Sequence, residues 1–206
     1  MASTPDGSSA RLILASASAA RAAMLHAAGV VFDVVPAAID EAIVKRQFRD
    51  HGKDALACAQ ALALAKARAV ATKYPNTAVV GADQILVAGD EWFDKPADLA
   101  AAKQQIRRLS GRSHILATAA CAVQGEAILW AATAEPKMTM RRIGESFLAE
   151  YIAVEGEDIL GSVGSYRIEG RGAQLFALIE GDYFSILGLP LLELLGFLRD
   201  RGFLED

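Results

Sequence analysis

Long apolar runs, basic clusters and zinc-binding patterns are all missing from this sequence of 206 residues. No stretch approaches the roughly 18 consecutive apolar residues of a membrane-spanning helix. No run of Lys or Arg forms a nucleic-acid footprint, and the formal net charge is −4. The three histidines, His26, His51 and His114, lie too far apart to predict a zinc site. We therefore expect no membrane-spanning helix, no nucleic-acid partner and no zinc domain.

Cysteine is also scarce, which bears on where the protein works. Cys58 and Cys121 lie within alanine-rich apolar patterns, so we expect buried free thiols and a reducing, cytoplasmic location. Residues 1–10 are rich in Ser, Thr, Pro, Asp and Gly and hold no apolar core. We expect them to form a disordered tail rather than a signal peptide.

Alanine dominates what is present, with 41 of the 206 residues, of which only Ala153, Ala173 and Ala177 lie beyond residue 150. Without alanine the apolar share falls from 53% to about a third, which is ordinary for a globular protein. The first three quarters should therefore be helix-rich and closely packed. The length fits one domain over residues 11–206, large enough to bury a core without a disulfide or metal.

Apolar periodicity and turn residues predict a mixture of helices and strands. Helices are expected over residues 19–28, 43–51, 54–74, 98–109, 145–154 and 191–201. Strands are expected over residues 11–15, 30–35, 77–87, 114–123, 127–133, 137–142 and 174–179, with a hairpin turn at 88–91. Because hairpins interrupt the alternation, we predict an α/β fold with a mixed sheet rather than a purely parallel one.

The first candidate for chemistry is the turn from Ser16 to Arg21, where a short strand passes into a helix. The free N–H groups of the helix start, the hydroxyls of Ser16 and Ser18 and the guanidinium of Arg21 suit a phosphate group. The alternative is that Ser18 only caps the helix and Arg21 is a solvated charge. Neither a Walker lysine motif nor a GxGxxG pattern is present.

Acidic and basic residues elsewhere in the chain extend this candidate site. Asp83 follows a β-branched apolar run, where a carboxylate is expensive unless it is paired, metal-bound or at a strand end. With Asp40 and Glu41 it could hold a hard divalent cation, although that pair alone is consistent with a solvated loop. The separated cations, each also consistent with a surface charge, are Lys66, Lys95, Arg112 and His114. Spacing alone therefore indicates a candidate phosphate site and no particular reaction.

The same residues make the chain resemble the Maf family of nucleoside triphosphate pyrophosphatases. The resemblance runs in the family's order from Leu12 to Leu198. Its segments are LILASASAAR (12–21), IDE (39–41), LAKA (64–67), VVGADQILV (79–87), KP (95–96), RRLSGRSHILAT (107–118), GSYRIEGRGA (164–173) and EGDYFSILGLPL (180–191). Each is weak alone, but eight in order form a specific signal.

The resemblance implies hydrolysis of a nucleoside triphosphate between the α and β phosphates, with Mg²⁺ or Mn²⁺ as cofactor. It implies an elongated fold with a central cleft, like that of inosine triphosphatase, and a homodimer as a common state. Carried onto this sequence, the resemblance makes Asp83 the general base. It also makes Glu41 and Asp83 the metal ligands. It makes Ser16, Ser18, Arg21, Lys66, Lys95 and Arg112 substrate-binding residues. We therefore expect a house-cleaning enzyme that removes modified nucleotides.

The sequence also departs from the family pattern, and the departures bear on the base. Family members usually have Pro at the position of Ala19 and Arg or Trp at the position of Ala20. A second Arg is common at the position of Ala22. Gln84 and Glu169 resemble the members that act on 7-methyl-GTP, whose further marker is a Trp at the position of Ala20. A carboxylate suits a cationic methylated base, but Ala20 offers no ring to stack on it. The expectation is a guanine-like or modified purine rather than thymine or uracil. An interaction protein of cell division or septum formation, with the cleft as a nucleotide sensor, is the alternative.

Overall fold

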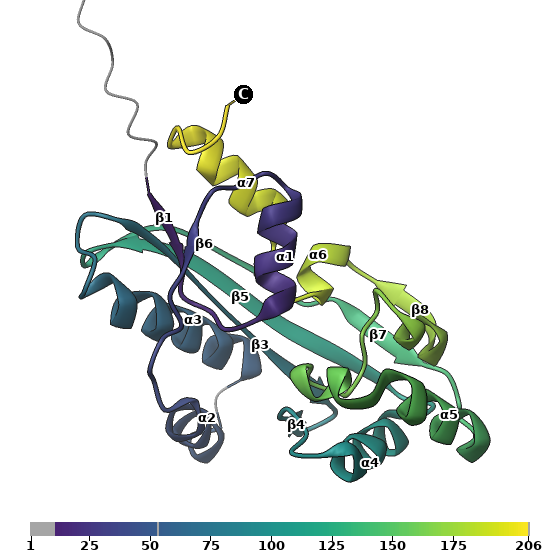
Figure 1. The fold of residues 1–206 in the computed structure, drawn as a ribbon. Helices are drawn as coiled ribbons and strands as arrows, with labels where there is room; N and C mark the ends of the chain where they lie inside the picture. The colour runs from purple at the N-terminus through teal and green to yellow at the C-terminus, as the bar shows by residue number, and fades with distance from the viewer. Residues whose placement is uncertain (1–10, 53, 206) are drawn as a thin grey trace, which may run out of the picture.

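A computed structural model describes residues 11–52 and 54–205, and within them the fold is a mixed α/β sheet with flanking helices. The strand order is β2-β1-β3-β5-β7-β8, with β4 paired to β3 and β6 paired to β5 (Figure 1). The strands are β1 Leu12–Leu14, β2 Asp33–Val34, β3 Ala78–Ala88, β4 Glu91–Phe93, β5 Ser113–Gln124, β6 Ala127–Ala134, β7 Lys137–Met140 and β8 Phe176–Glu180. The tail predicted for residues 1–10 lies outside the described residues.

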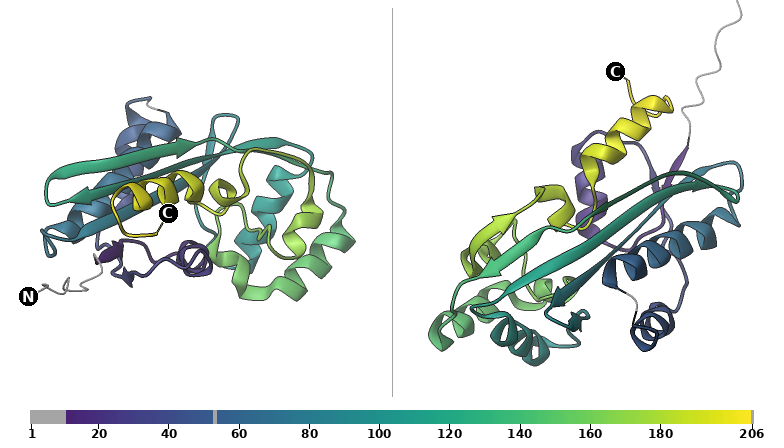
Figure 2. Two further views of the ribbon diagram at one scale, coloured as in Figure 1. Left: turned by 90° about the horizontal axis from the view of Figure 1, so that it is seen from above. Right: turned by 180° about the vertical axis from the view of Figure 1, so that it is seen from behind.

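Only the pairings of β1 are parallel, with β2 and β3, and every other pairing in the described sheet is antiparallel. The mixed sheet predicted from the hairpins is thereby confirmed. The register of β3 and β5 runs from Val79 opposite Val123 to Val87 opposite Ile115. Figure 2 shows that these two long strands extend along the longer dimension of the molecule.

Helices cover both faces of this sheet (Figure 2). They are α1 Ala19–Ala27, α2 Glu41–Asp50, α3 Ala55–Ala71, α4 Leu99–Leu109, α5 Glu145–Glu155, α6 Tyr183–Ile186 and α7 Leu191–Asp200, with 3-10 turns at Gly156–Gly161 and Arg171–Leu175. One apolar cluster joins α3 to β3 and β5, a second joins α1 and α7 to β1, and a third joins α4 and α5 to β7. No helix among the described residues is long and apolar enough to traverse a bilayer.

The close contact between α3 and β3 is made by small residues. Alanines recur every four positions on the buried face of α3, at Ala55, Ala59, Ala63, Ala67 and Ala71. A Cβ atom on Gly81 of β3 would lie 2.2 Å from the carbonyl oxygen of Ala63, so only glycine permits this approach. The contact brings Lys66 of α3 alongside Asp83 of β3.

One predicted element needs correction, and one element was missed. The strand expected over residues 30–35 shrinks to Asp33–Val34, because the N–H of Val30 donates to the carbonyl of Leu25 and continues the end of α1. The short helix α6 was not predicted. It forms because the Asp182 carboxylate accepts hydrogen bonds from the N–H groups of Phe184 and Ser185.

Candidate functional site

A cleft of about 990 Å³ opens where seven segments of the chain meet. Its walls include the turn before α1, the start of α2, residues 83–84 of β3 and the loop at residues 94–95. Leu116 of β5, residues between 158 and 169, and the end of α6 complete the lining. These segments are far apart in the sequence, and the strand order of the sheet brings them together.

The Lys66 side chain lies between two carboxylates of this cleft. Its Nζ is 2.5 Å from Oδ1 of Asp83 and 2.7 Å from Oε1 of Glu41. Lys66 and Asp83 are both buried, whereas Glu41 is half-exposed at the first position of α2. Burial alone would raise the pKa of Glu41, but the ammonium groups of Lys66, Lys45 and Lys95 bring it below its ordinary value. The carboxylate of Glu41 is therefore stabilised as an anion beside a buried cation.

The second carboxylate oxygen of Asp83, Oδ2, is buried and has no hydrogen-bond partner among the described residues. An unsatisfied buried charged oxygen is expensive, which is a signal that it meets a ligand, water or ion in the working protein. The described residues contain no group of three His, Cys, Asp or Glu side chains that could hold a metal unaided. Mg²⁺, however, is usually held by one or two carboxylates together with water and substrate phosphates. The oxygens of Glu41 and Asp83 fit such a substrate-completed site.

Arg21 differs from its expected role as a free phosphate donor. Its Nε donates to the carbonyl of Gly188 at 2.7 Å, and its Nη1 donates to Ser16 Oγ at 3.1 Å and to Ala82 O at 3.0 Å. The guanidinium is buried and joins the end of β1, strand β3 and the segment after α6. It still lines the cleft, but its principal contacts are internal.

The remaining residues of the turn before α1 keep an orientation that suits an anion. Ser18 caps α1, its hydroxyl accepting from the N–H of Arg21 at 3.4 Å, but the solvated Arg21 expected in the same alternative is wrong, because Arg21 is buried. Ser18, Ala19 and Ala20 line the cleft, so the start of α1 faces the open space. The first N–H groups of a helix lack partners within the helix and favour anions.

The basic residues predicted for the site separate into two groups. Lys95 lines the cleft and makes no ion pair within the described part of the chain. Burial and the nearby Arg21 and Lys66 lower its pKa, while Glu41 and Asp83 oppose that shift. Arg112 does not line the cleft, because its guanidinium contacts the carbonyls of Arg108 and Ala88 near the β3–β4 turn.

His114 is also separate from the phosphate-facing residues. It is buried, and its Nε2 lies 2.7 Å from the hydroxyl of Tyr166, which does line the cleft. Burial lowers the pKa of His114 to about 4, so the ring is neutral near pH 7. His114 therefore supports the cleft wall through Tyr166 rather than supplying a positive charge.

All three residues predicted to select the base, Ala20, Gln84 and Glu169, line the cleft. The side-chain nitrogen of Gln84 is occupied by Thr118 Oγ1 at 2.8 Å and by the carbonyls of Ser185 at 2.9 Å and Ile186 at 3.2 Å. Gln84 therefore anchors α6 as well as facing the cleft.

Glu169 has a partner that no sequence pattern indicated. Its carboxylate accepts from Nε of Arg167 at 3.3 Å, and Nη1 of Arg167 donates to Asp158 at 2.7 Å. Both newly found residues line the cleft, as do Lys45 and Asp94. Arg167 lies within the family segment GSYRIEGRGA, whereas no motif marks Asp158, Lys45 or Asp94, whose places in the cleft depend on tertiary contacts.

The cleft combines paired carboxylates, an exposed lysine and the start of a helix. This combination is typical of α/β proteins that bind phosphorylated ligands. The Maf-like protein family matches residues 11–201, and the chain belongs to that family. It is 51% identical over 191 residues to the nucleoside triphosphate pyrophosphatase of Granulibacter bethesdensis, covering 93% of this chain and 97% of that protein. It is 50% identical to the nucleoside triphosphate pyrophosphatase of Hyphomonas neptunium, covering 91% of this chain and 94% of that protein. It is 44% identical to the 7-methyl-GTP pyrophosphatase of Rhizobium etli, covering 95% of this chain and 98% of that protein.

Proposed function

We propose that this chain is a nucleoside triphosphate pyrophosphatase, which releases pyrophosphate and leaves a nucleoside monophosphate. The observation that carries the proposal is the Asp83–Lys66–Glu41 cluster on the cleft, with Oδ2 of Asp83 unpartnered among the described residues. The family and the names of relatives at up to 51% identity support the same activity. Those relatives carry enzyme names, so no observation favours the sensor of cell division over an enzyme.

Glu41 and Asp83 would hold a divalent cation, Mg²⁺ or Mn²⁺, which when bound neutralises charge on the phosphate oxygens. Lys66 fixes the orientation of Asp83 through the contact of 2.5 Å. Oδ2 of Asp83 orients a water molecule toward the scissile phosphoanhydride and accepts its proton. Lys95 and the start of α1 bind the phosphate chain and stabilise charge that develops on it.

The reaction is tested by identifying its products. The protein is incubated with single nucleoside triphosphates and Mg²⁺ or Mn²⁺, and the products are separated by ion-exchange chromatography. We expect equal amounts of monophosphate and pyrophosphate, and no turnover in EDTA. Release of orthophosphate with a diphosphate left behind would instead identify a γ-phosphatase. Substrates with a methylene bridge between the α and β phosphorus atoms serve as the control, since the proposed bond cannot be hydrolysed in them.

For the base, we propose a guanine-type or modified purine triphosphate in preference to dTTP or UTP. Glu169 accepts hydrogen bonds and can exchange its 3.3 Å contact with Arg167 for N–H donors of a guanine edge. The same carboxylate repels the carbonyl-rich edge of thymine or uracil. Removal of modified nucleotides in the cytoplasm is the role that such a preference would suit.

Replacing the carboxylate tests this preference. Glu169→Gln should lower the ratio of kcat/KM for GTP or 7-methyl-GTP over dTTP by about tenfold, the effect of roughly 1–3 kcal/mol for an unpaired polar group. Gln84→Thr is expected to strengthen the shift, but it also removes the anchor of α6. Asp158→Asn is the matched control, because Asp158 contacts the same Arg167 on the same wall. If the unaltered protein hydrolyses dTTP and UTP at least as well as every guanine nucleotide, the preference is wrong.

A further inference from the structure

Helix α2 carries Glu41 into the cleft although the helix itself is lightly attached to the molecule. None of its residues is buried. Val44 and Phe48 are partly buried against the apolar cluster around α3, and the guanidinium of Arg49 lies 5.1 Å from the centroid of the Trp92 ring. The polar attachments of α2 are the Glu41–Lys66 ion pair and two further ion pairs, made by Lys45 and Arg49. A helix with so little buried surface depends on polar contacts for its position.

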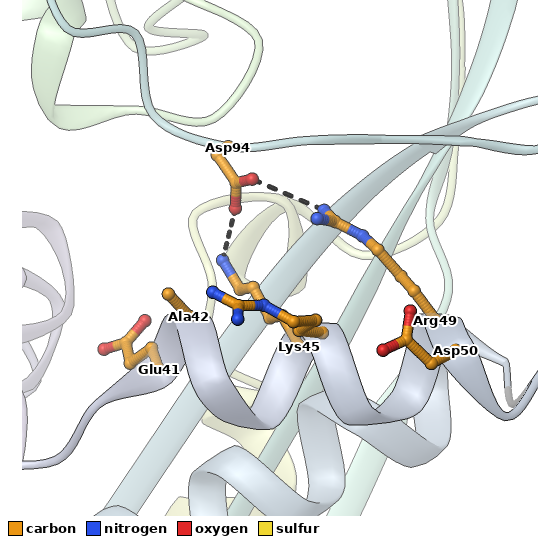
Figure 3. A pocket seen from close by; sticks show the side chains of 7 residues that line it. Glu41, Ala42, Lys45, Arg49, Asp50 and Asp94 are labelled. Carbon is orange, nitrogen blue, oxygen red and sulfur yellow. Dashed lines mark hydrogen bonds and ion pairs between the residues drawn. The ribbon is translucent and has the colours of Figure 1, made fainter.

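Both of these further ion pairs end on a single carboxylate, that of Asp94. Nζ of Lys45 lies 2.7 Å from Oδ1 of Asp94, and Nη2 of Arg49 lies 3.3 Å from Oδ2 (Figure 3). Lys45 and Arg49 are one helical turn apart, so they present two cations to the same side. The main chain of Asp94 is held in turn, because its carbonyl accepts from Nε2 of Gln105 on α4 at 2.7 Å.

Asp94 also lies at the boundary of two hollows. Glu41, Lys45 and Asp94 line both the cleft and a smaller hollow of about 390 Å³ beside α2. Lys95, the next residue in the chain, faces the cleft. Both oxygens of Asp94 are occupied by α2, so the carboxylate does not neutralise Lys95. One side chain therefore connects the helix that carries Glu41 to the loop that carries Lys95.

We propose that Asp94 is a positioning residue, which holds Glu41 and Lys95 at the separation that a metal–triphosphate complex requires. This proposal rests on the proposed function of the same cleft. Without the Asp94 carboxylate, α2 keeps its fold and its apolar contacts through Val44 and Phe48 but loses two of its ion pairs, and the Glu41–Lys66 pair is the remaining one. Binding of the metal and the phosphates then weakens, while Asp83 and its bond to Lys66 stay in place.

The test compares Asp94→Asn with Asp50→Asn. Asp50 lies on α2, lines the same small hollow and makes no ion pair in the described part of the chain, so the control removes the same charge without the contact. In Asp94→Asn, we expect the Mg²⁺ concentration for half-maximal pyrophosphate release to rise on the order of fivefold, the size of effect that exposed ion pairs produce. Turnover at saturating Mg²⁺ and nucleotide should stay within twofold. Asp94→Glu should restore most of the Mg²⁺ response.

Hydrogen exchange supplies a readout that does not depend on activity. Amides of residues 41–50 should exchange faster in Asp94→Asn than in Asp50→Asn, while amides of residues 55–71 stay unchanged. Equal Mg²⁺ responses in the two variants, or loss of turnover with an unchanged Mg²⁺ response, would overturn the role of Asp94. If the unaltered protein releases no pyrophosphate from any triphosphate, the proposed function fails instead. Hydrogen exchange, with Mn²⁺ titrations of each variant, then decides the role of Asp94 separately.

Discussion

Lys66 illustrates how much a single residue depends on its surroundings. In the sequence it is one cation within an alanine-rich helix, equally consistent with the surface. In the structure its side chain is 10% exposed and contacts two carboxylates. A buried ammonium is tolerated only when it is paired. Lys66 is not itself among the residues that line the cleft, and its charge keeps Glu41 and Asp83, which do line it, together.

Asp83 is the residue whose replacement tests the reaction centre. Asp83→Asn removes the charge and proton acceptor but keeps an oxygen that can accept from Lys66, and Glu41 still neutralises the ammonium at 2.7 Å. Stability should fall by less than the roughly 3–5 kcal/mol lost when a buried charge has no other partner. Turnover should fall on the order of 10²-fold or more, the effect of a lost acid–base group. Pyrophosphate release within threefold of the unaltered protein would remove Asp83 from the role of base.

At the scale of elements, the packing of α3 on β3 determines where Lys66 lies. The helix approaches so closely because alanine faces glycine across the interface. Ala63 and Ala67 flank the point at which a side chain on Gly81 would collide. Interiors this dense do not absorb an added methyl group without movement of the backbone. Asp83 of β3, which lines the cleft, and Lys66 of α3, which contacts it, are thus held in a fixed relation.

Gly81→Ala tests this relation between packing and function. The added Cβ would lie 2.2 Å from Ala63 O and 2.9 Å from the Cβ of Ala67, so α3 must shift. We expect a loss of about 1–3 kcal/mol in the free energy of unfolding and reduced turnover, as Lys66 moves relative to Asp83. The control is Gly196→Ala in α7, where a Cβ meets nothing within 4 Å. That change should stabilise by about 0.5–1 kcal/mol through helix propensity. Urea unfolding of both variants measures the difference, and equal stabilities would contradict this role of Gly81.

Element types were largely predictable from local patterns. The helices expected over 19–28 and 98–109 appear as Ala19–Ala27 and Leu99–Leu109, bounded by the caps Ser18 and Asp98. Local patterns misjudged residues 30–35, because an apolar β-branched sequence looks the same in a strand and in an irregular connection, here with Val31 and Val34 exposed. They also missed α6, which is only four residues long and depends on its Asp182 cap.

At the scale of the whole molecule, the sequence by itself determined the chemical types available to the cleft. Its ordered motifs contain Asp83, Glu41, Lys66 and Lys95, all of which reach the cleft or pair with a residue that does. The motifs also indicated the family, which the match over residues 11–201 confirms. Such motifs are readable because each is a local pattern of residues that chemistry requires together.

Only the tertiary structure decided which of these residues meet and what their charges do. Arg21 contacts Gly188 across 167 positions and is committed to internal bonds, whereas Arg112 turns away to the β3–β4 hairpin. Asp94 and Lys45 are 49 positions apart, and no periodicity links them. The physical reason is that pairing and desolvation depend on distance in space, which the packing of helices on the mixed sheet sets.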